Sequence, residues 1–402
     1  MTAVPQSCPV TTDFRFAGVG DVLGGFARFD ALQDEHRVWR VEEPGGSYWM
    51  VLDRELALRG LQDHETFSSS AITPLDPDPQ LRMIPIQLDP PEHGKWRRLM
   101  SGYFSPRRIR ELSERIEARV TELLDELEPR GECDYVHDFA FRFPTVIFLE
   151  IVGLPVSELP TFVDWVTAAL HADEDGVLDR AKQVAVMRQV MGRLAVELQQ
   201  RRAAPDPGAA DILSHALDWE VDGRPATDQE VLSCCLLLFL AGLDTVANEL
   251  SMATHHLATS PTDRAALAAH PDRAGAAVEE LLRAFTITQL ARKVTRDTEF
   301  GGQQLRAGEM VVFSLAAANR DTAALDRARE VVLDREPVPH YAFGAGPHRC
   351  LGSHLARQEM EIALRLWHQR IPDYALATDA PVREYRSSVY GVIDLPLRWA
   401  PT

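Results

Sequence analysis

Residues 341–359, YAFGAGPHRCLGSHLARQE, place Cys350 among glycines, a histidine and an arginine, just ahead of a helix-like pattern. The chain has five cysteines, an odd number without a CxxC pair, which argues against a disulfide framework or a four-thiolate zinc site. A lone activated cysteine serves as a nucleophile, a redox centre or a metal ligand. Each use needs the thiolate, whereas a free thiol has a pKa of about 8.5. A buried structural cysteine beside a glycine turn is the alternative.

The neighbours of Cys350 are of the kind that lower a thiol pKa. A helix predicted over residues 353–369 would direct its N-terminal dipole and free amides at the sulfur. Gly344, Gly346 and Gly352 would allow the backbone to approach closely, so that amides could stabilise negative charge. We therefore expect a lowered pKa for the Cys350 thiol.

A second chemical feature interrupts a long apolar pattern over residues 228–259. Thr227 and Glu230 form a capping box that predicts its start. The polar residues Asp244 and Thr245 fall near its middle, where a buried helix should stay apolar. A Thr245 hydroxyl bonded to the Ala241 carbonyl would loosen or bend the helix there. A helix with one exposed polar spot is the simpler reading.

The spacing Phe343-Gly-x-Gly-x-His348-x-Cys350-x-Gly352 resembles the haem-binding loop of the cytochrome P450 monooxygenases. Three companion motifs occur in the family's order. They are His93-x-x-x-Arg97 after Asp-Pro-Pro, Ala-Gly-Leu-Asp244-Thr245 in the long helix, and Glu280-x-x-Arg283. The resemblance runs from about Phe26 to the end of the chain and is strongest to soluble bacterial members, including the camphor-hydroxylase type.

The resemblance implies a mainly α fold with a small β portion and a long central helix over haem b. Cys350 would be the iron ligand, because an anionic sulfur pushes electron density onto iron and favours O–O cleavage. Phe343 would shield the thiolate, and amides such as that of Gly352 would tune its donation. The haem propionates would be neutralised by His93, Arg97, Arg292 and His348, although each of these could singly be an ordinary surface charge.

The resemblance also assigns the catalytic pair and a structural pair. Thr245 would stand beside the bound dioxygen, and Asp244 would pass protons inward to it. Glu280 and Arg283 would form a buried ion pair that holds the cysteine loop. Its third member would be His340, with Arg335 as the second candidate.

A basic cluster follows the first motif, although the chain carries a net charge of −18. Between His93 and Arg110 there is no acidic residue, and the basic side chains are Lys95, Arg97, Arg98, Arg107, Arg108 and Arg110. Such a patch steers an acidic partner. The resemblance implies an external ferredoxin, itself reduced by an NAD(P)H-dependent reductase. Nucleic-acid binding and a merely solvated helix start are the alternatives.

The resemblance places the substrate pocket among mostly apolar residues, which favours a small lipophilic guest held by few polar contacts. The candidates are Leu81, Met83, Ile84, Leu237, Leu240, Ala241, Thr288, Gln289 and Val389. Leu81 stands about where camphor-binding members use a tyrosine, which argues against camphor itself. Arg82 could attract a carboxylate, but a solvent-facing arginine is the simpler interpretation. Any pocket residue could also be core packing.

These residues must be positioned by a mostly helical scaffold. We expect helices over residues 106–128, 159–171, 177–202, 228–259, 273–283 and 353–369. VWRVEE and SYWMVL read as a hairpin, with shorter strands at residues 293–300, 310–313 and 389–397. No linker divides the chain, so we expect a single domain over residues 1–402, with residues 1–25 loosely ordered.

Composition limits the possible location and binding partners of the protein. The 402 residues are 45% apolar and acidic overall, which argues against nucleic-acid or anionic-membrane binding. The first residues lack a signal-peptide pattern, and the apolar run at 231–243 is too short to span a bilayer. We expect a cytoplasmic monomer. A peroxide-driven peroxygenase, a haem-binding sensor without turnover and a cysteine hydrolase are the other function classes; Asp244 and Thr245 argue against the first.

Overall fold

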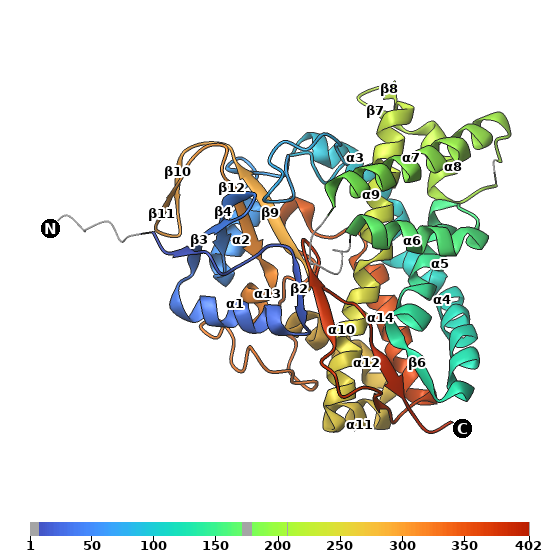
Figure 1. Cartoon of the computed structure of the whole chain (residues 1–402). Helices are drawn as coiled ribbons and strands as arrows, with labels where there is room; N and C mark the ends of the chain where they lie inside the picture. The colour runs from blue at the N-terminus through green and yellow to red at the C-terminus, as the bar shows by residue number, and fades with distance from the viewer. Residues whose placement is uncertain (1–7, 171–178, 207, 402) are drawn as a thin grey trace.

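The computed structural model describes residues 8–170, 179–206 and 208–401. A sheet-rich part formed largely by the N-terminal segment lies beside a larger helical part, and the yellow central helix runs through the helical part (Figure 1). The helices are α1 Gly24–Glu35, α2 Arg54–Gln62, α3 Glu92–Ser101, α4 Pro106–Leu127, α5 Arg142–Val152, α6 Leu159–Leu170, α7 Arg180–Ala203, α8 Ile212–His215, α9 Asp228–Leu243, α10 Thr245–Thr259, α11 Pro261–Ala269, α12 Ala274–Ala284, α13 Leu315–Asn319 and α14 Ser353–Arg370.

The predicted helices agree with α4, α6, α7, α12 and α14 to within a few residues. The predicted C-terminal end of α6 and N-terminal end of α7 fall partly in residues 171–178, outside the described residues. Sequence reasoning missed α1, α2, α3, α5 and α11 and the short α8 and α13. The α5 sequence, RFPTVIFLEIV, is buried almost all round, so it has no polar face to mark a helical period.

The predicted central helix is present as α9 and α10, which meet at Asp244. The capping box forms as expected, because the Thr227 side chain accepts from the Glu230 amide and Glu230 accepts from the Thr227 amide. By length and composition this helix could cross a membrane, yet 56% of its apolar window is buried inside the protein. Its apolar character therefore serves the protein core.

The main sheet has the order β1-β3-β4-β12-β9-β5. The predicted hairpin is β3 Val38–Glu43 with β4 Gly46–Val51, and β12 Met310–Ser314 pairs with β4 in parallel and with β9 Gln289–Val294 antiparallel. β1 Val10–Thr11 and β5 Phe67–Ser68 form the edges. The expected single strand over 293–300 is wrong, because β9 ends at Val294 and β10 Thr298–Phe300 turns back to pair with β11 Gln303–Leu305.

The smaller sheets tie the two chain ends to the helical part. β2 Gly18–Asp21 and β15 Gly391–Val392 flank β14 Arg383–Arg386, whereas β16 Pro396–Arg398 lies between β13 Ala375–Leu376 and β6 Glu132–Asp134. β7 Glu220–Val221 pairs with β8 Arg224–Pro225. The tail forms two separate short strands instead of the expected one. In the segment expected to be loosely ordered, residues 8–25 include β1, β2 and the start of α1, and their backbone pairs with β3 and β14, whereas residues 1–7 lie outside the described residues.

The main sheet separates two hydrophobic cores. Trp49, Val311 and Phe313 belong to the core on the α2 side, whereas Met50 and Val312 belong to the larger core shared with α1 and the helical part. This alternation follows from the two-residue period of a strand. The same alternation applies to β9, the neighbour of β12. The side chains of β9 on the α2 side face the cysteine loop, because α2 packs against both β12 and that loop.

Candidate functional site

The loop before Cys350 is tightly folded. The Cys350 amide donates to the Phe343 carbonyl at 2.8 Å, and the Gly344 amide donates to the Tyr341 carbonyl at 2.8 Å. Gly346 has a φ of +69°, and a Cβ there would lie 2.4 Å from the Leu61 carbonyl oxygen of α2. Only glycine fits this left-handed position against another backbone. The loop is therefore fixed in shape before it presents the thiol.

The electrostatics of Cys350 differ from the expectation. Burial raises the pKa of the Cys350 thiol, while the hydrogen-bonding Gly352 amide and the nearby Arg97, Arg349 and Arg357 oppose that rise without reversing it. The predicted lowering of the Cys350 pKa is wrong, because the free-energy cost of removing a thiolate from water exceeds the stabilisation that these groups provide. The side chain is nevertheless accessible, so the sulfur lies in a recess lined by protein. A thiolate at this position needs a cation as its partner, which is the chemistry of a metal ligand.

Phe343 is held in place by a chain of charged groups. The Arg357 guanidinium lies 4.4 Å from the centre of the Phe343 ring, and both oxygens of Glu279 accept from Arg357. His340 lies 3.1 Å from the same Glu279 carboxylate. Burial would raise the pKa of Glu279, but His340 and Arg357 outweigh it and lower the pKa to about 2. This cluster orients the aromatic ring beside the cysteine loop.

The Glu280–Arg283 pair is buried, as predicted. Arg283 donates to Glu280 at 2.7 and 2.8 Å, and its remaining donors bond the backbone carbonyls of Asn319, Ala328 and Glu330. All five guanidinium donors are thus used. Asn319 in turn accepts from the Tyr341 amide at the start of the cysteine loop. The pair therefore supports the loop through Asn319.

The third member of that pair is Arg335, not His340. Arg335 donates to both Glu280 oxygens at 3.1 Å, whereas His340 contacts the preceding glutamate, Glu279. The expectation for His340 is wrong because adjacent helix positions point about 100° apart, so Glu279 and Glu280 serve different clusters. Burial would raise the pKa of Glu280, but Arg283 outweighs it and the pKa is lowered.

Four basic side chains gather near the cysteine loop. The rings of His93 and His348 lie 4.0 Å apart, and both residues interact electrostatically with Arg97 and Arg292. Burial, reinforced by these cations, lowers the pKa of His348 to about 2 and that of His93 to about 4. Burial also lowers the pKa of Arg292 to about 10. The four predicted propionate partners are therefore brought together.

This basic group fits an anionic ligand. Arg292 is 4% exposed, and among the described residues its guanidinium donates one hydrogen bond, to the Ala291 carbonyl. The buried Nε2 of His348 has no hydrogen-bond partner within the same part of the chain. Buried donors without acceptors are costly, and carboxylates of a bound group would satisfy them. The residues at this site therefore fit haem, with a sulfur ligand and carboxylate partners.

The middle of the central helix exposes one stripe. Thr245 donates to the Ala241 carbonyl at 2.9 Å, as expected. Leu237, Ala241 and Thr245 are accessible at four-residue spacing, although most of their neighbours in the helix are buried. Residues four apart share a helix face. The stripe therefore presents the predicted hydroxyl together with apolar surface, whereas Leu240 lies at its buried edge.

Asp244 is buried, with no exposed surface. The Tyr385 hydroxyl donates to its two carboxylate oxygens at 3.0 and 3.1 Å, and the Asn248 amide donates to the Tyr385 oxygen at 2.6 Å. Sequence reasoning missed Tyr385 and Asn248. Asn248 could have been found, because it follows Asp244 by one helical turn, but nothing in the sequence brings Tyr385 to the central helix.

The other predicted pocket residues divide into two groups. Thr288 and Val389 are half-buried and face each other across a backbone bridge. The segment with Leu81, Met83 and Ile84 is half-buried as well and is tied to α9, because Ser233 bonds the backbone of Arg82 and Ile84. The Arg82 guanidinium donates to the Gln87 carbonyl of its own loop, which favours the simpler interpretation of that residue.

Gln289 is buried, and neither polar atom of its side-chain amide has a hydrogen-bond partner among the described residues. Strand alternation places it with Ala291, whose side chain belongs to the core on the α1 side of the sheet. Arg292 and Leu290 point to the opposite face, and Leu290 lies next to Gly344 of the cysteine loop. Met83, Ile84 and Val389 pack in the same core as Ala291, so the place of Gln289 in the pocket stays a prediction.

The predicted basic patch is partly neutralised. Lys95 pairs with Glu92 and Asp222, and Arg107 and Arg108 both pair with Glu111. Glu92 and Glu111 lie just outside the acid-free stretch and Asp222 is distant in the chain, so sequence counting missed them. Arg97 donates to the Arg349 carbonyl, which brings α3 to the cysteine loop. Within the described residues, the exposed Arg98 and Arg110 have no ion-pair partner.

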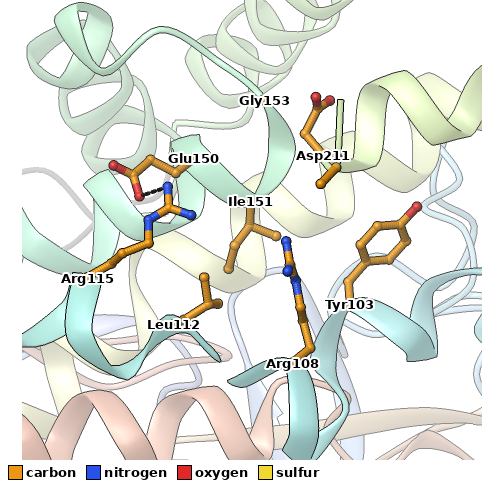
Figure 2. Close-up of a pocket in the computed structure, with 9 residues that line it drawn as sticks. Tyr103, Arg108, Leu112, Arg115, Glu150, Ile151, Gly153 and Asp211 are labelled. Carbon is orange, nitrogen blue, oxygen red and sulfur yellow. Dashed lines mark hydrogen bonds and ion pairs between the residues drawn. The ribbon is translucent and has the colours of Figure 1, made fainter. Parts of the chain in front are cut away.

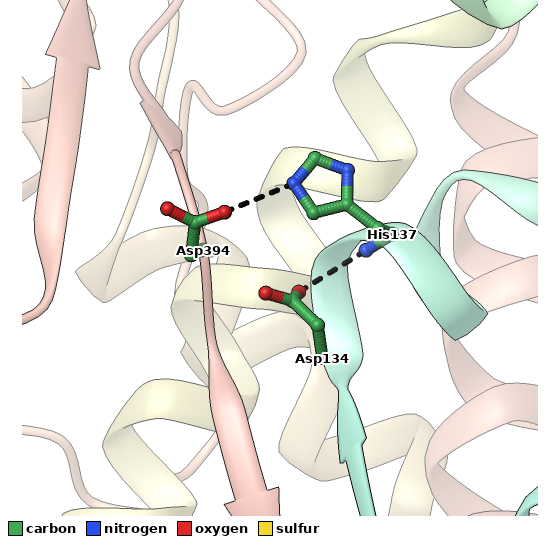
Figure 3. A group of neighbouring side chains, drawn as sticks. All are labelled: Asp134, His137 and Asp394. Atoms are coloured by element: carbon green, nitrogen blue, oxygen red, sulfur yellow. Dashed lines mark hydrogen bonds and ion pairs between the residues drawn. The ribbon is translucent and has the colours of Figure 1, made fainter. Parts of the chain in front are cut away.

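Two further clusters lie apart from this site. A hollow of about 200 Å³ between α4, α5 and the start of α8 is lined by Tyr103, Arg108, Arg115, Glu150 and Asp211 among others, and Arg115 pairs with Glu150 there (Figure 2). Asp134, His137 and Asp394 meet at the surface (Figure 3). One Asp134 oxygen already accepts from the amides of Val136, His137 and Leu395, so this carboxylate clamps the local backbone.

Comparisons with known proteins agree with this geometry. The family model described as Cytochrome P450 matches residues 24–370. A probable cytochrome P450 127A1 of Sinorhizobium fredii is 35% identical over 358 residues, which cover 89% of this chain and 84% of that protein. Pentalenic acid synthase of Streptomyces avermitilis is 32% identical over 385 residues, covering 92% of this chain and 93% of that protein. The crystal structure of CYP101J2 matches with a TM-score of 0.87 and 32% identity, covering 99% of this chain and 100% of that one.

Proposed function

The chain belongs to the cytochrome P450 family, and we propose that it inserts one atom of dioxygen into a small hydrophobic molecule, using electrons from an external ferredoxin. The family's members are monooxygenases, so the chain is an oxidoreductase that uses haem b and dioxygen. The reaction would be a hydroxylation, an epoxidation or a dealkylation.

The observation that carries this proposal is the shared location of one accessible thiol and one buried basic group. Cys350 would hold the haem iron, and the neighbouring His93, Arg97, Arg292 and His348 would hold the propionates. When bound, haem supplies an iron that binds dioxygen and accepts electrons. The cations around Cys350 then favour its thiolate, because the metal offsets the cost of burial.

Thr245 and Asp244 supply protons to the site where dioxygen would bind. The Thr245 hydroxyl donates to Ala241 within the helix. By turning its O–H away from Ala241 it can donate to a neighbouring oxygen while a lone pair accepts the next proton. Asp244 is buried beside it in the chain and replaces that proton. The bend at this position exposes the hydroxyl on the same stripe as Leu237 and Ala241.

The substrate is a lipophilic molecule. The accessible residues that we assign to the pocket are Leu81, Met83, Ile84, Leu237, Ala241, Thr288 and Val389. All are apolar except Thr288, which adds one hydroxyl. Such a lining orients a guest by shape and by few polar contacts. Two relatives are a pentalenic acid synthase and a mycinamicin IV hydroxylase/epoxidase.

A small acidic ferredoxin supplies the electrons, and an NAD(P)H-dependent reductase reduces it. The exposed Arg98 and Arg349 lie on the elements that Arg97 joins beside Cys350, so a partner that docks there comes close to the thiolate. We assign the chain to the cytoplasm as a monomeric, single-domain enzyme that binds neither nucleic acid nor membrane.

The test is the absorption spectrum of the reduced carbon-monoxide complex. The wild-type holoenzyme should give the thiolate-type band, and Cys350→Ser should lose it. Cys8→Ser, at a half-buried cysteine outside the site, is the matched control and should keep the band. An unchanged band in Cys350→Ser would remove Cys350 as the ligand.

A screen of lipophilic compounds for the iron spin-state shift would then identify the guest. Product formation should require ferredoxin, its reductase and NAD(P)H. Turnover with hydrogen peroxide alone would support a peroxygenase instead, and ligand binding without any turnover would support a sensor.

A further inference from the structure

The loop over residues 81–88 is hydrogen-bonded to the central helix through Ser233. This serine lies in the first half of α9 and is 6% exposed. Its hydroxyl donates to the Arg82 carbonyl and accepts from the Ile84 amide at 3.2 Å. A serine hydroxyl has one proton and two lone pairs, so one side chain serves both backbone groups that flank Met83.

The direction of this hydroxyl differs from that of other serines in the central helix. A serine inside a helix can bond the carbonyl four residues earlier, as Ser251 does with Ala247 at 2.7 Å. Within the described part of the chain, Ser233 makes its hydrogen bonds with the loop and none with its own helix through the side chain. The hydroxyl therefore joins two segments whose bonded residues lie 149 and 151 positions apart.

Gln87 completes the backbone pairing around Met83. Its Oε1 atom accepts from the Met83 amide at 2.7 Å, and its own amide donates to the Met83 carbonyl at 3.0 Å. The four backbone groups from the Arg82 carbonyl to the Ile84 amide are thus all paired, two by Ser233 and two by Gln87. Met83 is therefore held at a defined position, although its segment is neither helix nor strand.

The hydroxyl of Ser233 lies at one end of the accessible stripe on the central helix. Ser233 precedes Leu237 by four residues and thus shares its helix face. Leu237 and Ala241 are accessible, whereas Ser233 is buried, so the stripe ends where the loop covers the helix. Met83 is half-buried and packs against the larger core. It therefore belongs to the wall at this end of the pocket that we assign to the substrate.

We propose that Ser233 is a positioning residue for the substrate, because its hydroxyl holds Met83 in the wall of the pocket. This inference rests on the proposed function, which supplies the lipophilic guest. Without the hydroxyl, the Arg82 carbonyl and the Ile84 amide lose their partner, and the loop populates other conformations. A guest then binds only the fraction of molecules in which the loop is in place, so its apparent affinity falls by that fraction. Ser233 thereby sets how tightly a guest is held and takes no part in the oxygen chemistry.

The experiment compares Ser233→Ala with Ser251→Ala in the holoenzyme. Both serines are buried in the central helix, and the Ser251 side chain bonds its own helix. The probes are imidazole, which needs only the iron, and miconazole, a bulky lipophilic imidazole whose rings the pocket must also accommodate. Ser233→Ala should raise the Kd for miconazole about ten-fold, as expected for a lost hydrogen bond, and should leave the Kd for imidazole unchanged. Ser251→Ala should change neither Kd, as measured by the shift in haem absorption.

A double-mutant cycle separates positioning from packing. If Ser233 acts through Met83, Ser233→Ala should raise the miconazole Kd much less in a Met83→Ala background. An equal rise in both backgrounds, or no rise in the single variant, would overturn the proposal. A rise in the imidazole Kd would overturn it as well, since the change would then have disturbed the whole haem site. Wild-type protein that binds imidazole but not miconazole would remove the pocket assignment and the proposal with it.

Hydrogen exchange gives a readout that needs neither turnover nor a guest. The Ile84 amide loses its acceptor in Ser233→Ala, so it should exchange about ten-fold faster in that variant and at the wild-type rate in Ser251→Ala. An unchanged Ile84 rate in Ser233→Ala would contradict the inference. If the wild type makes no NAD(P)H-dependent product, the proposed reaction fails, while the azole titrations and the exchange rates still decide whether Ser233 positions the pocket wall.

Discussion

The Thr245 hydroxyl lies 2.9 Å from the Ala241 carbonyl oxygen, one turn earlier in the central helix, and donates a hydrogen bond to it. The same hydroxyl is accessible on the stripe that faces the site. Thr245→Ala should therefore keep the haem and the fold but lose proton delivery, so that electrons are diverted into hydrogen peroxide. We expect product per NAD(P)H to fall about ten-fold or more, within the range for general acid–base groups, as measured by parallel assays of product and peroxide.

Thr245→Ser is the control for this prediction, because it keeps the hydroxyl and loses only a methyl group. Serine should restore most of the coupling between electron use and product. Full coupling in Thr245→Ala would exclude the hydroxyl from the relay and leave it the role of bending the helix.

Replacing the buried Arg283 is predicted to lower the free energy of unfolding much more than replacing an exposed arginine of a similar ion pair. Arg283→Met would leave Glu280 with less compensation and would orphan three backbone carbonyls. Breaking a buried pair from one side costs about 3–5 kcal/mol. Urea unfolding should show a loss of that size, accompanied by faster haem loss, because Asn319 links the pair to the cysteine loop.

Arg327 offers a matched comparison, since it also pairs with a glutamate three residues away. The Arg327 and Glu330 side chains are 54% and 58% exposed, so Arg327→Met should cost only about 0–1 kcal/mol. Similar losses of unfolding free energy in the two variants would show that burial of the Glu280–Arg283 pair adds nothing to its stabilising effect.

The cysteine loop and the central helix could be predicted from the sequence because their chemistry is local. Glycines at fixed offsets from Cys350 and a capping box at Thr227 determine backbone shape within a few residues. The family, the fold class and the haem cofactor that these motifs implied are confirmed. The break at Asp244 was predictable as well, because a threonine hydroxyl inside a helix can bond the carbonyl four residues earlier and bend the helix.

Contacts between distant segments were not predictable. His340 and Arg335 both precede the cysteine, and only the helix geometry at Glu279 and Glu280 decides which of them joins the buried pair. The face of the sheet on which Gln289 lies could not be predicted, because strand alternation assigns a face only when the register is known. Tyr385 gave no signal, since its partner Asp244 lies 141 positions earlier in the chain. The raised pKa of Cys350 depends on burial, which local composition does not reveal.

His368 is predicted to destabilise the protein in acid. Burial lowers its pKa from 6.5 to about 4, so the unfolded chain holds more protons than the folded one between these values. The free energy of unfolding therefore falls as the pH drops through this window. One such group loses about 2 kcal/mol between pH 7 and pH 5, and His368→Gln should reduce the acid loss by that amount in urea unfolding at the two pH values.

His354 is the control, because it lies exposed on the same helix, α14. His354→Gln should leave the pH dependence unchanged. Some acid loss should remain in His368→Gln, since burial also lowers the pKa of His255 to about 4. An identical pH dependence in wild type and His368→Gln would mean that His368 is not held neutral by burial.

Arg98 is predicted to matter more for electron transfer than Arg107, although both belong to the basic cluster. Arg98 is exposed and has no ion-pair partner among the described residues, whereas Arg107 pairs with Glu111. Arg98→Glu should raise the ferredoxin concentration needed for half-maximal reduction several-fold at low salt, and the effect should shrink at high salt because screening weakens steering. Arg107→Glu should have a smaller effect, since its charge is already partly compensated. Equal effects of the two reversals would show that net charge alone attracts the ferredoxin, and a salt-independent defect in Arg98→Glu would indicate a fault in haem retention instead of docking.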